Sequence, residues 1–163
     1  MKTVLIVYHS MTGGAQQMAE AAYRGASSER DVRVRLLRAA AAEPADVLAA
    51  EAYIFVTPEN LAAIAGTMKD FFDRTYYAAL DRIAGRPYSI LVCAGSDGRN
   101  AVRQIERICT GWRLKAVAEP LIVCTHAQTP EAILAPKRIE ADALSKCEEI
   151  GAGLAAGIAL GIY

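Results

Sequence analysis

The stretch that decides the fold runs from Thr3 to Gln16 and reads TVLIVYHSMTGGAQ. Its first part, Thr3–Tyr8, is a continuous apolar run rich in β-branched residues, which is typical of a parallel strand buried on both faces. Helical spacing of apolar residues begins at Ala15. A strand that leads through a tight glycine turn into a helix is the repeating unit of α/β folds. The stretch therefore predicts the first strand and first helix of such a fold.

The same two patterns, a continuous apolar run and a helical spacing of apolar residues, alternate along the rest of the chain, so that strand and helix repeat five times. The expected strands are Thr3–Tyr8, Val32–Leu37, Ala52–Val56, Tyr88–Cys93 and Val117–Cys124, and the expected helices are Ala15–Arg24, a short one within Ala39–Ala50, Thr67–Leu80, Ala101–Trp112 and Pro136–Leu160. Because crossovers between parallel strands are right-handed, few topologies remain. We predict an α/β three-layer sandwich with a five-stranded parallel sheet of order 2-1-3-4-5, helices on both faces, and a single domain over residues 1–163.

Composition narrows the functional classes. The 163 residues are 53% apolar, and 18 basic residues balance 18 acidic ones, so the whole molecule has no charge that favours nucleic acid. The four cysteines are far apart and pair with no histidine at a metal-ligand spacing, so we expect buried thiols and no metal site. The apolar tail Ile150–Ile162 is shorter than the roughly 20 residues of a membrane span. With Met1-Lys2 leading directly into a strand, we expect a cytoplasmic protein without a membrane span.

Glycines recur every fourth residue in the last expected helix, at Gly153, Gly157 and Gly161. Glycine lowers helix stability by about 1 kcal/mol relative to alanine. We therefore expect these residues to let the helix approach the sheet closely.

Ligands of open α/β sheets bind beyond the carboxyl ends of the strands, where the strand order reverses. The loop after the first strand, His9–Gln16, offers two hydroxyls, a tight glycine pair and the start of a helix. Successive backbone N–H groups and the positive helix end form a site for a phosphate monoester. The loop has no lysine or arginine, so neutral donors would hold the dianion. An ordinary tight turn with a capped helix is the alternative.

Two further loops are expected at the same edge. Thr57–Gly66 is polar at its start and then apolar, so that it can lie along a flat aromatic ligand; a plain solvent loop is the alternative. Ala94–Arg99 can close the opposite side of that ligand, and its alternative is a helix start capped by Ser96 or Asp97.

Together these loops resemble those of flavodoxin-like FMN proteins and of NAD(P)H-dependent FMN reductases. The first loop is similar to the phosphate signature Ser/Thr-x-Thr-Gly-x-Thr. Residues Pro58–Lys69 read PENLAAIAGTMK and are in register with the reductase stretch at Pro58, Glu59, Gly66 and Lys69. The resemblance implies bound FMN, NADH or NADPH as co-substrate, and a flavodoxin-like fold. It implies that FMN contacts Ser10, Met11, Thr12, Gly13, Gly14 and Ala15 at its phosphate, Pro58, Glu59, Asn60, Leu61, Ala62 and Ile64 at the ribityl chain and ring, and Ala94, Gly95, Ser96 and Asp97 at the other ring edge.

The sequence departs from these signatures, and Leu61, Ala62 and Ala63 replace polar and glycine positions of the reductase stretch. Ala15 replaces the last hydroxyl of the phosphate loop, and Asn60 stands where reductases have tyrosine. Since aromatic stacking contributes about 0.5–1.5 kcal/mol per pair, the missing ring predicts weaker FMN binding. It also predicts an open flavin face that admits a nicotinamide.

Two functions follow from the resemblance. The first is an NAD(P)H-dependent oxidoreductase that passes electrons through FMN to a quinone, a flavin or a similar small acceptor; the flavin carries the chemistry, so no catalytic residue is assigned. The second is a flavodoxin-type electron carrier, against which the zero net charge argues. A hydrolase is disfavoured, because Ala94 stands where the Gly-x-Ser-x-Gly elbow around Ser96 needs its first glycine.

The resemblance also implies a homo-oligomer, a dimer or tetramer. Phe71, Phe72, Tyr76 and Tyr77 lie within seven residues of one expected helix. Four aromatic side chains so close together cannot all face one core, so an interface and ordinary packing both remain open for them.

Overall fold

The computed structural model describes residues 1–163 and alternates strands with helices. The strands are β1 (Lys2–Tyr8), β2 (Val32–Arg38), β3 (Ala52–Asn60), β4 (Ala63–Ile64), β5 (Pro87–Ala94), β6 (Lys115–Ala116) and β7 (Leu121–Cys124). The helices are α1 (Gly14–Ala26), α2 (Pro44–Ala49), α3 (Gly66–Ala79), α4 (Arg99–Gly111), α5 (Pro130–Leu134) and α6 (Ala141–Ala159).

The sheet has the expected parallel order, β2-β1-β3-β5, with β6 and β7 both beside β5. The expected flavodoxin-like topology is thus confirmed. The prediction of five strands was wrong in one respect, because the sheet has seven strand segments. The fifth expected strand, Val117–Cys124, is interrupted before Leu121, where Pro120 has no N–H to donate to a ladder. The seventh segment, β4, pairs antiparallel with the end of β3.

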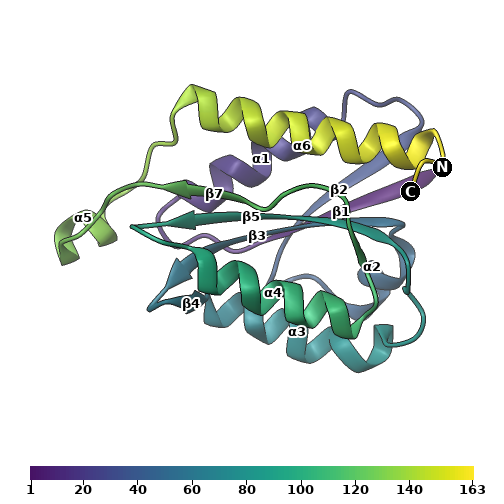
Figure 1. Ribbon diagram of the computed structural model, residues 1–163, viewed down its shortest axis with the longest axis horizontal. Coiled ribbons are helices and arrows are strands. Elements are labelled where there is room, and N and C mark those ends of the chain that lie inside the picture. The colour runs from purple at the N-terminus through teal and green to yellow at the C-terminus, as the bar shows by residue number, and fades with distance from the viewer.

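Helices cover both faces of the sheet (Figure 1), α1 and α6 on one side and α3 and α4 on the other. Successive residues of the central strands therefore enter two separate cores. In β1, Leu5 and Val7 join the core under α3 and α4, whereas Val4 and Ile6 join the core under α1 and α6. This two-sided burial explains why the strands read as unbroken apolar runs.

The two cores differ in the side chains that fill them. Nearly all aromatic packing lies on the α3 and α4 side, where Phe55 contacts Phe71, Phe72 and Trp112. Phe71 and Phe72 are buried, and Tyr76 stacks on Trp112 at 5.6 Å between ring centroids. Only Tyr77 of the four clustered aromatic residues is exposed, so ordinary packing accounts for three of them.

Small residues at the contact between α1 and α6 bring the two helices close together. A Cβ added at Gly151 would overlap the carbonyl oxygen of Ala22, and one added at Gly25 would overlap the carbonyl oxygen of Glu148. The expected close approach of Gly153, Gly157 and Gly161 to the sheet was wrong. Nothing lies within 4 Å of a Cβ at Gly153, a Cβ at Gly157 would meet the ring of Tyr163, and Gly161 lies beyond the end of α6.

The contact between α1 and α6 predicts opposite effects for two neighbouring alanine substitutions. Gly151→Ala forces a methyl group against the backbone of α1 and should lower the free energy of unfolding by about 1–3 kcal/mol. Position 153 is exposed, and nothing lies within 4 Å of a Cβ there. Gly153→Ala should therefore raise that free energy by about 0.5–1 kcal/mol through helix propensity. Urea unfolding of both variants measures the two effects. Equal effects would contradict this packing.

Candidate functional site

Three loops meet at the carboxyl edge of the sheet because β1, β3 and β5 are neighbours that run in parallel. Tyr8 at the end of β1 pairs with Val56, and Pro58 near the end of β3 pairs with Cys93. The segments that follow are His9–Gly13, Leu61–Ala65 and Gly95–Gly98. The structure thus brings together the loops that the sequence singled out.

The first loop presents backbone N–H groups at the start of α1. Gly13 adopts a left-handed conformation with φ of +95°, and its N–H donates to Ser10 Oγ at 3.0 Å. The remaining backbone N–H groups of this turn donate to no other protein group, and they belong to Met11, Thr12, Gly14, Ala15 and Gln16. Such a nest of donors at a helix N-terminus binds anions.

Glycine at position 14 is required by a close contact beneath the loop. A Cβ there would lie 2.7 Å from Cys93 Sγ on β5. Burial raises the pKa of the Cys93 thiol to about 11, although the nearby charge of Lys137 lowers it. The thiol is thus neutral at physiological pH and serves as packing under the loop.

Residues far along the chain complete the first loop, and sequence reasoning missed them. The N–H of Lys137 donates to the Thr12 carbonyl oxygen at 2.8 Å. The Gln17 amide donates to the carbonyl oxygens of Gly13 at 2.9 Å and Lys137 at 2.7 Å, and it accepts from the N–H of Ile139 at 3.0 Å. No local pattern signals the contacts of Lys137 and Ile139, since they join residues 120 to 125 positions apart.

The second loop was expected to be irregular, and this expectation was wrong. Thr57–Asn60 continue β3, and the chain returns through β4 in an antiparallel hairpin. Leu61 and Ala62 form its turn, with φ of 49° and 61°, and both are exposed. Left-handed backbone disfavours residues with a side chain, so this turn holds local strain. Such strain is often found where a ligand is clamped.

Helix α4 holds that hairpin in place. The Asn100 side chain donates to the Ala62 carbonyl oxygen at 2.5 Å, and the N–H of Ile64 donates to Gln104 Oε1 at 2.8 Å. The strained turn is therefore fastened to the helix that starts just after the third loop.

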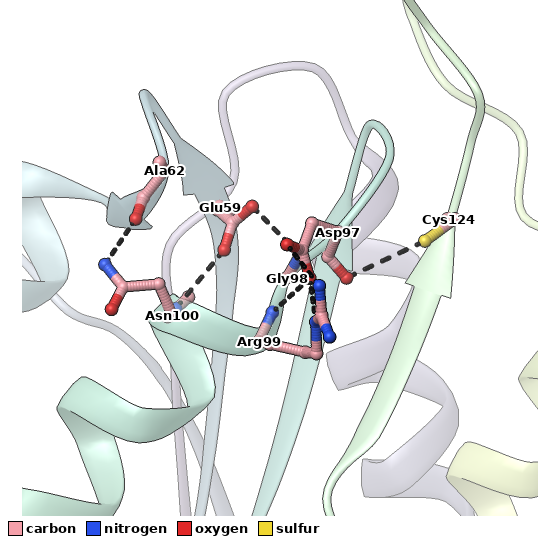
Figure 2. A network of polar contacts seen from close by, with 8 residues as sticks. Glu59, Ala62, Asp97, Gly98, Arg99, Asn100 and Cys124 are labelled. Atoms are coloured by element: carbon pink, nitrogen blue, oxygen red, sulfur yellow. Dashed lines mark hydrogen bonds and ion pairs between the residues drawn. The ribbon is translucent and has the colours of Figure 1, made fainter.

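Glu59 connects the second and third loops directly (Figure 2). One carboxylate oxygen accepts the Gly98 N–H at 2.9 Å, and the other accepts the Ala101 N–H at 3.3 Å. The carboxylate thus occupies the N-terminus of α4, where the N-cap residue Gly98 has no side chain and Asp97 accepts only one backbone N–H, that of Arg99. A negative charge there stabilises the helix. Glu59 is therefore engaged by protein groups and positions both loops.

The third loop faces solvent on one side and β7 on the other. Ser96 and Asp97 are exposed, and the Asp97 carboxylate pairs with Arg99 at 2.6 Å. The guanidinium of Arg99 lowers the pKa of Asp97. On the β7 side, the His126 N–H donates to the Gly95 carbonyl oxygen at 2.8 Å. The loop is thus anchored by backbone contacts and leaves the Ser96 hydroxyl exposed.

The two histidines differ in surroundings. His9 is half-buried, and burial together with the neighbouring Arg38 lowers its pKa, so it stays neutral at pH 7. His126 is exposed and has a left-handed φ of 60°. Both lie at carboxyl ends of strands, as expected.

A hollow of about 620 Å³ lies beside these loops and not over them. It runs between β7 and the start of α6, and Thr125, His126 and Lys137 line the end nearest the first loop. None of the residues expected at the FMN site lines it. No helix of this chain has the length and apolar character needed to cross a bilayer. No three His, Cys, Asp or Glu side chains gather as a metal site.

Residues 29–129 match the family described as NADPH-dependent FMN reductase. The chain belongs to this family. The match includes the β3–β4 hairpin and the third loop, whereas the first loop and Lys137 lie outside it.

Two curated relatives share part of the chain. It is 33% identical over 95 residues to an NAD(P)H dehydrogenase (quinone) of Acidithiobacillus ferrooxidans, covering 46% of this chain and 48% of that one. It is 37% identical over 73 residues to a flavodoxin of Aquifex aeolicus, covering 45% of this chain and 40% of that one. The matched region thus spans half or less of each relative.

Solved structures agree in fold over nearly the whole chain. An archaeal flavodoxin superposes with a TM-score of 0.79 at 18% identity, covering 96% of this chain and 99% of that one. A flavodoxin, WrbA-like protein from Agrobacterium tumefaciens gives 0.73 at 18% identity, covering 98% and 99%. At this identity the likeness establishes the flavodoxin-like fold alone.

The contacts of Glu59 predict a loss of stability when its carboxylate is removed. Glu59→Ala leaves two N–H groups at the start of α4 without their acceptor and should lower the free energy of unfolding by about 1 kcal/mol. Asp73→Asn is the control, because it removes an exposed pair with Lys69 and should change that free energy by less than about 0.5 kcal/mol. Urea unfolding measures both. A Glu59→Ala protein as stable as the control would contradict the capping role.

The cysteine environments predict selective alkylation. Burial raises the pKa of Cys93 to about 11 and that of Cys147 to about 12, so at pH 8 both stay as unreactive thiols. Cys124 is half-buried at the end of β7. Iodoacetamide at pH 8 should therefore modify Cys124 first in the folded protein, and all four cysteines in urea, as peptide mass spectrometry measures. Modification of folded Cys93 at the rate of Cys124 would contradict this.

Proposed function

We propose that this chain binds FMN and oxidises NADH or NADPH, passing electrons through the flavin to a quinone, a flavin or a similar small acceptor. The observation that carries the proposal is the nest of unpaired N–H groups in the first loop, placed beside two further loops in a member of this family. The residues assigned to FMN from the resemblance lie in these three loops or in the strand ends and helix start that flank them: Ser10–Ala15, Pro58–Ala62, Ile64 and Ala94–Asp97.

The first loop fits the phosphate of FMN. Its N–H groups at Thr12, Gly14 and Ala15 have no protein acceptor, and hydroxyls at Ser10 and Thr12 add two donors. Backbone N–H groups without a protein acceptor are available to donate to phosphate oxygens. Ala15 itself contributes only its backbone.

The hairpin and the third loop supply the walls for the flavin ring. Leu61 and Ala62 form an exposed apolar tip on one side, and Ala94 and Gly95 lie at the end of β5. The absence of an aromatic clamp at Asn60 supports access of a nicotinamide to the ring. Glu59 acts here as a positioning residue, because its carboxylate holds α4 and thereby both walls.

The protein residues bind and orient, while FMN, when bound, supplies hydride and electron transfer. No acid or base is assigned to the chain. His9 is half-buried and neutral at pH 7, so it adds no positive charge near the first loop.

A one-electron carrier of the flavodoxin type is the second candidate. The relative from Aquifex aeolicus, itself a flavodoxin, favours it. The relative from Acidithiobacillus ferrooxidans, an NAD(P)H dehydrogenase (quinone), favours the oxidoreductase and a quinone as acceptor. The balanced charge of 18 basic and 18 acidic residues favours the oxidoreductase as well, because carriers dock on their partners through a strong charge.

Three further expectations complete the proposal. The chain forms one domain over residues 1–163, works in the cytoplasm, and assembles as a homo-oligomer. Of the four clustered aromatic residues, Tyr77 on α3 is the exposed one and is available for such an interface.

The proposal is tested by visible spectroscopy of the protein with added FMN, followed by anaerobic NADH or NADPH. We expect shifted flavin bands on binding and rapid bleaching by at least one nucleotide. Bands that resist both nucleotides, but are reduced by dithionite in two one-electron steps, would favour the carrier. No binding at micromolar FMN would overturn both functions.

Two glycine variants connect that result to the first loop. Gly13 and Gly85 both have left-handed φ, +95° and +82°, so alanine at either should cost about 1–2 kcal/mol of stability. Gly85 lies in a turn before β5, at the opposite end of that strand from the loops. Gly13→Ala should weaken FMN binding about tenfold, a change of about 1.4 kcal/mol, and Gly85→Ala should leave it unchanged. Equal affinities would contradict the assignment of the loop.

A further inference from the structure

The first loop contains neutral donors only, yet the phosphate monoester proposed for it is a dianion. The structure places the cation of Lys137 beside the loop's Thr12–Gly14 end. Lys137 Nζ lies 3.5 Å from Thr12 Oγ1, and its Cβ lies 3.4 Å from the position of a Cβ at Gly14. Its charge also reaches Cys93, which lies directly beneath the loop.

The backbone of Lys137 is fixed in this position. Its N–H donates to the Thr12 carbonyl oxygen, and its own carbonyl oxygen accepts from the Gln17 side chain. Ile139, two residues further along the chain, is buried in the core under α1 and α6. Gln17 is on the first turn of α1, so the helix that follows the loop also holds the lysine. The loop and Lys137 are therefore one unit, although 120 residues separate them.

The charge of Lys137 is not neutralised by any acidic side chain. Its ammonium forms no ion pair and instead donates to carbonyl oxygens at the end of α5, those of Ala132 at 2.7 Å, Ile133 at 2.8 Å and Ala135 at 2.6 Å. Carbonyl dipoles solvate a cation without cancelling its charge. Helix α5 buries no residue, and in Figure 1 it extends away from the sheet. The ammonium is thus free to exchange carbonyl oxygens for a stronger acceptor.

We propose that Lys137 is a specificity-determining residue for the phosphate of FMN, which supplies from the far end of the chain the positive charge that the loop lacks. The inference rests on the proposed function. A charge-assisted bond from an ammonium to phosphate is about twice as strong as one between neutral groups. Riboflavin has the same ring and ribityl chain but no phosphate. Lys137 therefore favours FMN over riboflavin, whereas the neutral donors and the ring walls contribute to both.

A purely structural role, in which Lys137 only caps α5, leads to different results. Loss of a cap on a helix that buries nothing would change FMN and riboflavin binding alike, or neither. An electrostatic role changes FMN binding alone, and its effect decreases as salt screens the charge. These two consequences separate the roles without any measurement of turnover.

The test compares Lys137→Gln, Lys137→Arg and the control Arg138→Gln with the wild-type protein. Arg138 is the adjacent exposed cation, and its substitution changes the net charge equally. Dissociation constants for FMN and riboflavin are measured by fluorescence quenching at low and high NaCl. The thermal shift produced by inorganic phosphate is measured on the same proteins.

We expect Lys137→Gln to weaken FMN binding about tenfold, a change of about 1.4 kcal/mol. It should leave riboflavin binding unchanged, flatten the salt dependence and remove most of the phosphate-induced thermal shift. Lys137→Arg should retain most of the FMN affinity, and Arg138→Gln all of it.

Other outcomes separate the two proposals. If the wild-type protein binds FMN and Lys137→Gln binds it equally well, the role of Lys137 is overturned and the proposed function stands. An equal loss for FMN and riboflavin, or an equal loss in Arg138→Gln, overturns that role too. If the wild-type protein binds no FMN, the proposed function fails, and the thermal shift produced by inorganic phosphate then tests Lys137 alone. A shift that Lys137→Gln removes supports a phosphate site that includes Lys137. The absence of a shift in the wild-type protein overturns that site.

Discussion

The structure depends above all on the burial of the central strands on both faces. Val4 and Ile6 of β1 point into one core and Leu5 and Val7 into the other, and β3 and β5 behave in the same way. Polar side chains are therefore rare inside these strands, where Ser89 of β5 is buried, and gather at the strand ends. Since β1, β3 and β5 are parallel neighbours, their carboxyl ends bring three polar loops together at one edge. The candidate site follows from this constraint.

The two cores beneath the site differ in the side chains that fill them. The aromatic core under α3 and α4 is filled by large side chains around Phe55. The core under α1 and α6 is filled by aliphatic side chains and alanine, and α6 lies close against α1 at Gly25 and Gly151. The close packing of these helices accompanies the docking of Lys137–Ile139 on the first loop.

The second and third loops behave as one unit because of Glu59 and α4. The carboxylate holds the start of the helix, and Asn100 and Gln104 on the helix hold the hairpin. Each contact joins residues about 40 positions apart. Strain in the Leu61–Ala62 turn is maintained by these contacts, in agreement with the general observation that surrounding structure must compensate for unfavourable backbone angles.

The α/β class, the strand order and the three loops can be predicted from the amino-acid sequence alone. Apolar periodicity is a local pattern that marks each strand and helix, and the right-handedness of crossovers is a general rule that limits their order. Only the tertiary structure decided which residues meet across the chain. The β3–β4 hairpin has no turn motif in its Asn60–Ala63 stretch, and it exists through contacts with α4. Gly151 rather than Gly153 faces α1, since a difference of two residues turns a side chain by about 200° around a helix. Lys137 reaches the first loop through long-range packing, which leaves no mark in a local sequence pattern.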